Sequence, residues 1–169
     1  MYDSRPDTIR HKNTVGKYIN CIINVLQKRI KYHDHTKLYD PEKTIFDKVT
    51  PKLKELTYGS EEYKTQLKEM QEALDHHYKE NSHHPEHYEN GIRDMDLVDI
   101  IEMLCDWKAA SERHSDGDIM KSIEINKKRF NYSDDLKQIF INTVKRRMEP
   151  IQYIENESNV LTNSFEDYK

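Results

Sequence analysis

Glycine and proline are scarce in this chain of 169 residues, which contains 4 of the first and 5 of the second. Such a shortage of turn-forming residues disfavours a turn-rich β architecture and favours long helices. No apolar run reaches the roughly 20 residues that a membrane-spanning helix requires. The N-terminus also lacks the apolar stretch of a secretory signal peptide. We therefore expect a cytoplasmic protein without a membrane partner.

Cysteine and positive charge are limited as well. The 2 cysteines, Cys21 and Cys105, lie among apolar residues of predicted helices, which indicates reduced, packed thiols and not a disulfide framework or a zinc knuckle. The formal net charge is −4, so no overall positive field attracts nucleic acid. We expect no duplex nucleic acid partner, whereas a small anionic substrate is compatible with this composition.

The spacing of apolar residues at three and four predicts an all-α protein. Residues 1–150 are expected to form a single helical domain, and residues 151–169 a polar C-terminal tail. The most apolar helix is expected at the centre of this domain, because it is apolar on most of its circumference. The predicted helices run over Thr8–Tyr32, from Asp40–Pro41 to Val49, briefly from Thr50–Pro51, from Gly59–Ser60 to Lys79, from Asp94 to Ser115 (the most apolar helix), from Asp116–Asp118 to Phe130, and from Ser133 to Pro150.

Histidine is the residue type present in excess. Of 9 histidines, seven fall between residues 33 and 87, in two tight groups. The groups are His33 with His35, and His76, His77, His83, His84 and His87.

The first group belongs to the segment Tyr32-His33-Asp34-His35-Thr36-Lys37. Adjacent histidine and aspartate side chains can ligate one metal, and this donor pair suits Mn, Fe, Co, Ni or Zn. On a helical turn Lys37 lies on the same face as Asp34, where its ammonium could neutralise phosphate oxygens. Taken alone, a His-Asp dipeptide is more often a surface pair.

In the second group, His77 keeps register with the apolar stripe of its helix, while His76 lies about 100° away. A single histidine on an apolar face is more often a hydrogen-bonded core residue than a ligand. Here further imidazoles follow within a turn or two, and their mutual burial would be costly without a metal or carboxylates. We therefore favour a metal, with His77 and not His76 as the inward ligand.

Three carboxylates, those of Asp99, Glu102 and Asp106, follow on the most apolar helix. Like charges at these spacings repel one another, and Asp106 has no cation one turn away to compensate it. The alternative is that this stripe is the one solvated face of the helix, which remains open for Asp99. For Asp106 we favour an inward carboxylate that binds a metal.

In order, these features resemble the signature of the HD-domain phosphohydrolase superfamily: a histidine, a His-Asp pair, further histidines and a distal aspartate. His33-Asp34-His35-Thr36-Lys37 is similar to the His-Asp-x-x-Lys version of that motif. Residues 83–91, HHPEHYENG, are similar to the double-histidine segment of the HD-GYP branch, although the Gly-Tyr-Pro that names this branch is missing. The resemblance implies an HD-like helical bundle with a buried metal centre.

A closer resemblance, over about residues 8–115, is to a phage and bacterial family, the domain of unknown function 5662. Its pattern is a histidine ahead of an HD-x-S-K motif, a paired HH…N-x-HH segment and an E-M-x-x-D-W helix. This chain has His11, HDHTK at 33–37, HHYKENSHH at 76–84 and EMLCDW at 102–107. If a phage encodes the chain, the expected location is the host cytoplasm.

The resemblance implies hydrolysis of a nucleotide or another small phosphate ester or anhydride with one or two divalent metals. Lys37 would stabilise developing charge, and Glu102 could orient the attacking water. His83 and His84 would complete a second metal position or contact the phosphate. His11 can join the site only if a tight turn within residues 18–26 folds its helix into a hairpin. The implied metal ligands are His11, His33, Asp34, His77, His83, His84 and Asp106.

Other functions would use the same residues. A di-iron oxygenase can use a similar set of ligands on helices. A non-catalytic protein could sequester a nucleotide in the same pocket. A helical interaction module with surface histidines would bind no metal.

Overall fold

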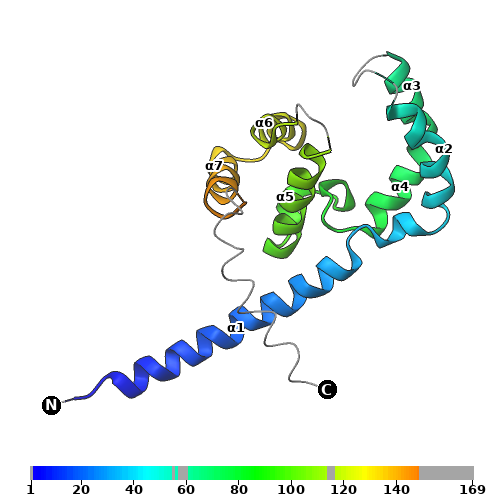
Figure 1. Ribbon diagram of the computed structural model, residues 1–169. Coiled ribbons are helices and arrows are strands. Elements are labelled where there is room, and N and C mark those ends of the chain that lie inside the picture. The colour runs from blue at the N-terminus through cyan, green and yellow to red at the C-terminus, as the bar shows by residue number, and fades with distance from the viewer. Residues whose placement is uncertain (1, 55, 57–60, 114–116, 149–169) are drawn as a thin grey trace. The chain divides into compact units, whose positions relative to one another are not determined.

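The structure is a computed structural model that describes residues 2–54, 56, 61–113 and 117–148. Within these ranges every regular element is helical and no strand occurs, so the prediction of an all-α chain is confirmed (Figure 1). The chain divides into two compact units, Met1–Asp106 and Trp107–Lys169. The predicted polar tail, 151–169, lies outside the described residues.

The described residues of the first unit form five α-helices, the last of which crosses the boundary between the units, and three short 3₁₀ turns. Helix α2 packs against α3 and α4, and the turn η1 packs against both α2 and α4. In chain order the elements are α1 (Arg5–Tyr32), η1 (His35–Leu38), α2 (Glu42–Lys54), α3 (Glu61–Glu69), α4 (Gln71–Glu80), η2 (Pro85–His87), η3 (Gly91–Asp94) and α5 (Leu97–Ser111).

Helix α1 is continuous, and the hairpin expected within residues 18–26 is wrong. It runs unbroken from Arg5 to Tyr32, the long blue helix of Figure 1. Gly16 is its only glycine, and a lone glycine inside a helix costs only about 1 kcal/mol relative to alanine. At 1.5 Å per residue, the 22 residues from His11 to His33 span about 33 Å along one helix.

Local capping explains where the next helix begins, and two predicted boundaries shift. Asp40 Oδ1 accepts hydrogen bonds from the backbone N of Thr44 (3.2 Å) and from its hydroxyl (2.5 Å), which supports the start of α2. Pro51 lies inside α2 and does not start a new helix. The helix predicted to reach Lys79 is instead two helices, which meet at the buried Met70. Its predicted cap, residues 59–60, lies outside the described residues.

The second unit is built on α6 (Ile119–Phe130), α7 (Asp134–Thr143) and the π-helical turn η4 (Val144–Met148). Asp118 caps α6 by accepting from Met120 N at 2.8 Å, and Ser133 caps α7 by accepting from Leu136 N at 3.1 Å. Both caps match the sequence prediction. The C-cap of α6 is Asn131, which has a left-handed φ of 49°. Asparagine tolerates this backbone conformation well.

Aromatic side chains form the core of this second unit. The ring of Trp107, the only tryptophan, lies 5.8 Å from that of Phe140 and 6.3 Å from that of Tyr132, measured between centroids. The Tyr132 hydroxyl donates to the carbonyl oxygen of Ile123 at 2.7 Å, so its polar end is satisfied inside the core. Phe140 is 1% exposed.

Both cysteines are free, but they are exposed and not packed, so that part of the thiol prediction is wrong. Cys21 is exposed because α1 contains no buried residue. Across the described part of the chain, no helix combines the length and apolar character needed to cross a membrane.

Truncation of the buried aromatic ring should destabilise the second unit. We expect Phe140→Ala to lower the free energy of unfolding by about 3–5 kcal/mol, since it removes a buried ring and leaves a cavity. Urea unfolding followed by Trp107 fluorescence measures this change. Its neighbour Ile139 is 57% exposed, so Ile139→Ala is the control and should change stability by about 0.5 kcal/mol or less. Equal effects of the two substitutions would contradict the assigned core.

Candidate metal centre

The turn that follows α1 fixes the position of Asp34. Helix α1 ends at Tyr32, and the backbone N of His33 closes its last turn on Arg29 O at 2.7 Å. Asp34 then takes a left-handed backbone conformation with φ 54°, which is uncommon outside glycine but available to aspartate. Lys37 N donates to the Asp34 carbonyl at 2.9 Å and starts η1. This left-handed turn directs the Asp34 carboxylate toward the imidazoles at the end of α4 and in the loop that follows it.

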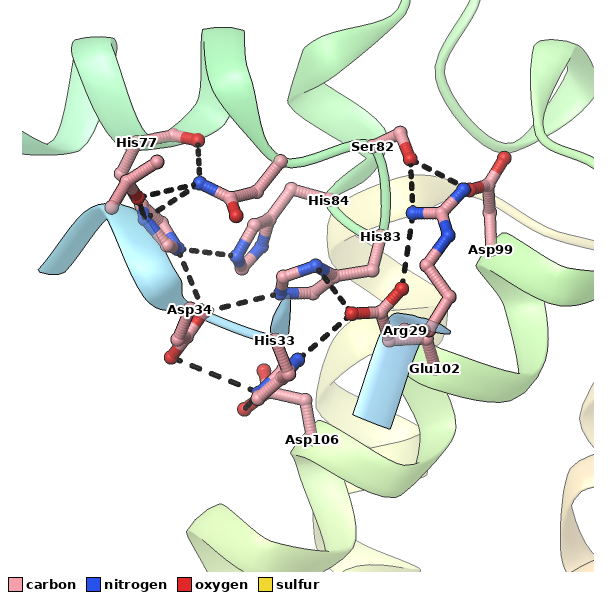
Figure 2. A network of polar contacts seen from close by, with 12 residues as sticks. Arg29, His33, Asp34, His77, Ser82, His83, His84, Asp99, Glu102 and Asp106 are labelled. Carbon is pink, nitrogen blue, oxygen red and sulfur yellow. Dashed lines mark hydrogen bonds and ion pairs between the residues drawn. The ribbon is translucent and has the colours of Figure 1, made fainter. Parts of the chain in front are cut away.

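These imidazoles come from the last turn of α4 and the loop behind it. His77 and His83 are each 1% exposed, and His84 is partly buried. Asn81 ends α4 and holds the loop, because its side-chain amide donates to the His77 carbonyl at 2.8 Å and to Thr36 Oγ1 at 2.9 Å. In Figure 2 the three rings and Asp34 face one another.

The facing atoms of this cluster are nitrogen and oxygen at short range. His77 Nε2 lies 2.9 Å from His84 Nε2 and 3.3 Å from Asp34 Oδ1, and His83 Nε2 lies 3.5 Å from the same oxygen. Asp34 Oδ1 and His83 Nε2 are both buried, yet neither has a hydrogen-bond partner with acceptable geometry. Leaving a buried polar atom unpaired costs about 1–3 kcal/mol. One atom from each of the four residues could ligate a single metal ion, which would satisfy both unpaired atoms.

The protonation states of the cluster suit metal ligands. Burial, together with the neighbouring rings of His83 and His77, lowers the pKa of His84 to about 3. Burial also lowers the pKa of His83. For Asp34, burial alone would raise the pKa, but contacts with His77 and Lys37 outweigh it and lower the pKa below its usual value. Neutral imidazole and ionised carboxylate are the forms that bind a metal.

Two carboxylates contact the Nδ1 atoms of these histidines, on the side of the rings away from the facing Nε2 atoms. Glu42 is fully buried, with one oxygen 3.0 Å from His77 Nδ1 and the other 2.8 Å from His76 Nδ1. Glu102 Oε1 lies 3.4 Å from His83 Nδ1. A carboxylate that accepts from Nδ1 keeps the proton on that nitrogen, so the lone pair of Nε2 points into the cluster. The hydrogen bond with Glu42 therefore orients His77 with Nε2 as its available ligand atom, and the ion-pair contact of His83 Nδ1 with Glu102 favours the same orientation of His83.

A second group adjoins the first and shares Asp34 with it. His33 Nε2 lies 3.7 Å from Asp34 Oδ2 and 3.7 Å from Asp106 Oδ1, and these three residues could also ligate one ion. On its other side His33 Nδ1 contacts Glu102 Oε1 at 2.9 Å. Hydrogen bonding to Asp106, and secondarily to Glu102, raises the pKa of the His33 imidazole to about 10. A metal that binds at this position must therefore displace a proton from His33.

Arg29 links this end of α1 to α5. Its guanidinium donates to Asp99 Oδ1 at 2.8 Å and to Glu102 Oε2 at 3.1 Å, and the same group donates to the Ser82 hydroxyl at 2.6 Å (Figure 2). The Tyr88 hydroxyl donates to the other oxygen of Asp99 at 2.6 Å. Arg29 therefore anchors Glu102, the carboxylate that contacts both His33 and His83.

The residues proposed as ligands from the sequence meet in this region, except for one. The clustered residues are His33, Asp34, His77, His83, His84 and Asp106. His11 is exposed on α1, about 33 Å along the helix from His33. Lys37 Nζ contacts Asp34 Oδ2 at 2.6 Å, at the edge of the cluster.

Two of the carboxylates have partners that the sequence did not indicate. Glu102 contacts the outer nitrogens of two imidazoles, and its role in orienting a water stays a prediction. Asp99 is 2% exposed, so the interpretation that left it on a solvated face is wrong. Its charge is compensated by Arg29, which lies too far away in the sequence to be identified as its partner.

Sequence reasoning did not identify Arg29, Glu42 or Asn81. Arg29 precedes His33 by one helical turn, so helix register placed both on one face and could have indicated it. Glu42 and Asn81 gave no such signal, because the contacts of Glu42 with His76 and His77 and of Asn81 with Thr36 join separate elements.

A family model described as "Family of unknown function (DUF5662)" matches residues 1–148 of the chain. No curated protein and no solved structure matches it.

Adjacent histidines on α4 provide a matched test of the candidate metal centre. We expect His77→Ala to weaken Zn²⁺ or Co²⁺ binding by about 100-fold or more, beyond the 10–100-fold typical of a lost supporting contact. His76→Ala should weaken it far less, since His76 contacts Glu42 but lies outside the cluster. Calorimetric titration of metal-stripped protein measures both, and circular dichroism checks that each variant is folded. Equal effects, or a larger effect of His76→Ala, would contradict the assigned ligand.

Proposed function

This chain belongs to the family DUF5662, and we propose that it is a metal-dependent phosphohydrolase that acts on a nucleotide or another small phosphate ester or anhydride. The observation that carries the proposal is the pair of buried, unpartnered ligand atoms, Asp34 Oδ1 and His83 Nε2, in a cluster of three imidazoles. The HD-domain resemblance of the sequence supports the same chemistry.

Four residues would hold the first metal ion: Asp34, His77, His83 and His84. His33 and Asp106 would share Asp34 with them at a second position. The donor set of imidazole and carboxylate suits Mn, Fe, Co, Ni or Zn. A bound divalent ion of this kind supplies a water of lowered pKa and polarises a phosphoryl oxygen.

The surrounding side chains would keep these ligands in place and bind the substrate. Glu42 and Glu102 are positioning residues, because they hold the outer nitrogens of His77, His83 and His33. Lys37 is the catalytic residue of the proposal. Its ammonium is partly exposed beside Asp34, where it can donate to a phosphate oxygen and stabilise the charge that develops there.

The proposal is tested by elemental analysis of the purified protein, followed by a panel of nucleotides and phosphate esters with Mn²⁺, Co²⁺, Ni²⁺ and Mg²⁺. The expected result is at least one bound divalent ion per chain and release of phosphate from one class of compound. A nucleotide that is bound and recovered intact would indicate a sequestering protein instead. Iron that turns over only with oxygen would indicate an oxygenase. Absence of bound metal would contradict every version of the site.

Lys37 distinguishes a hydrolase from a protein with a purely structural metal. We expect Lys37→Ala to lower kcat by about 100-fold or more, the size of effect seen when a charge-stabilising donor is lost. Metal content should be retained, because the ammonium contacts Asp34 Oδ2 and is not itself a ligand.

Lys43→Ala is the control for this substitution, since Lys43 is exposed and pairs with Asp47 away from the cluster. It should leave turnover and metal content unchanged. If Lys37→Ala retains full turnover on the substrate that the panel identifies, Lys37 has no part in the mechanism.

A further inference from the structure

Helix α1 carries a row of large apolar side chains that remain open to solvent. The helix contains no buried residue, although Val15, Tyr18, Ile19, Ile22 and Val25 are apolar and between 41% and 64% exposed. At 100° per residue these side chains, with Leu26, lie within about 60° on either side of Ile22. A face of this width is what a helix normally buries against a neighbour. An exposed apolar face of this kind marks an interaction site.

The arrangement of this face is close to symmetric about Ile22. Ile19 and Val25 lie three residues before and after Ile22, and Tyr18 and Leu26 lie four residues before and after it. Eleven residues away are two histidines, His11 and His33, both within about 20° of the centre of the face. An antiparallel pair with its two-fold axis at Ile22 places each residue beside the one equally far from the centre on the other helix.

The alternative parallel pairing is less favourable. It would set Arg29 against Arg29 and His33 against His33, and both helix dipoles would point the same way. In the antiparallel pair Val15 lies opposite the aliphatic part of Arg29, whose charge is already held by Asp99 and Glu102. A second copy of the chain is therefore the occupant that suits this face.

The area of the face is sufficient for such a pair. Six apolar side chains per helix expose on the order of 80 Å² each, so two copies would bury about 1,000 Å², the least that a specific interface is expected to bury. Contacts by residues flanking the row add to this area. A stable dimer, and not only a transient contact, is the expected state.

We propose that two chains pair through antiparallel α1 helices centred on Ile22, and that the partner's His11 thereby reaches the His33–Asp34 end of the metal centre. Within one chain these residues are about 33 Å apart along α1. Across the two-fold axis, each lies eleven residues from Ile22 and the two face each other. The pairing depends only on the apolar face, whereas the contribution of His11 rests on the proposed function.

The pairing is tested by sedimentation equilibrium of the full chain under reducing conditions. Wild type should be a dimer and Ile22→Glu a folded monomer, since the substitution places two carboxylates together at the centre of the face. Asn20→Glu is the matched control, because Asn20 lies about 160° from Ile22 and should leave the dimer intact. A monomeric wild type would overturn the proposal and would mean that another segment or a different partner covers the face. A dimer that survives Ile22→Glu would also overturn it.

The orientation of the helices is tested by disulfide formation in a background with Cys21→Ser and Cys105→Ser. One chain carries Tyr18→Cys and a second, size-tagged chain carries Leu26→Cys. Antiparallel helices should give cross-links mainly between the two different chains, because positions 18 and 26 lie at the same height. Links formed only between identical chains would show parallel pairing and overturn the proposal.

The contribution of His11 is tested with Zn²⁺ binding. His11→Ala should weaken binding by about tenfold or more in the dimer, as expected when a group at the metal centre is lost, and should change nothing in the Ile22→Glu monomer. A dimer that binds metal equally well without His11 would overturn this role. A dimer that binds no metal at all would refute the proposed function and leave the pairing intact, so the two failures can be told apart.

Discussion

The candidate site depends on one constraint, which is that imidazole and carboxylate groups removed from water need partners. His77 and His83 are almost fully buried, and both face the single carboxylate of Asp34. A hydrogen-bonded core would have paired these atoms, yet Asp34 Oδ1 and His83 Nε2 remain without partners. Because desolvation is costly for each of them, the arrangement is explained most simply by an ion that binds both.

The rest of the first unit can be understood as support for this cluster. The left-handed turn at Asp34 brings its carboxylate into the site, and Glu42 and Glu102 fix the outer nitrogens of the rings. Arg29 then compensates the charge of Glu102 and connects α1 to α5. The end of α1 is thus held by polar contacts, whereas the apolar side chains along the helix are exposed.

Sequence periodicity was sufficient to predict the helical class and the caps at Asp118 and Ser133, because these depend on residues close together in the chain. Residue type identified most of the clustered residues, since grouped histidines and aspartates stand out in the sequence. Contacts such as Glu42 with His77, or Arg29 with Asp99, could not be predicted, because they depend on how separate helices pack. The expected hairpin in α1 was inferred from the motif resemblance, whereas the residues from Arg5 to Tyr32 form one continuous helix with no break between residues 18 and 26.

The most direct test of the metal centre is anomalous X-ray diffraction from crystals grown with Zn²⁺ or Co²⁺. The account predicts an ion within about 2.0–2.2 Å of the Asp34 carboxylate and of Nε2 atoms of the clustered histidines. A second, weaker peak beside His33 and Asp106 is compatible with this prediction. Crystals in which these side chains bind no metal, with the ion elsewhere or absent, would contradict the account.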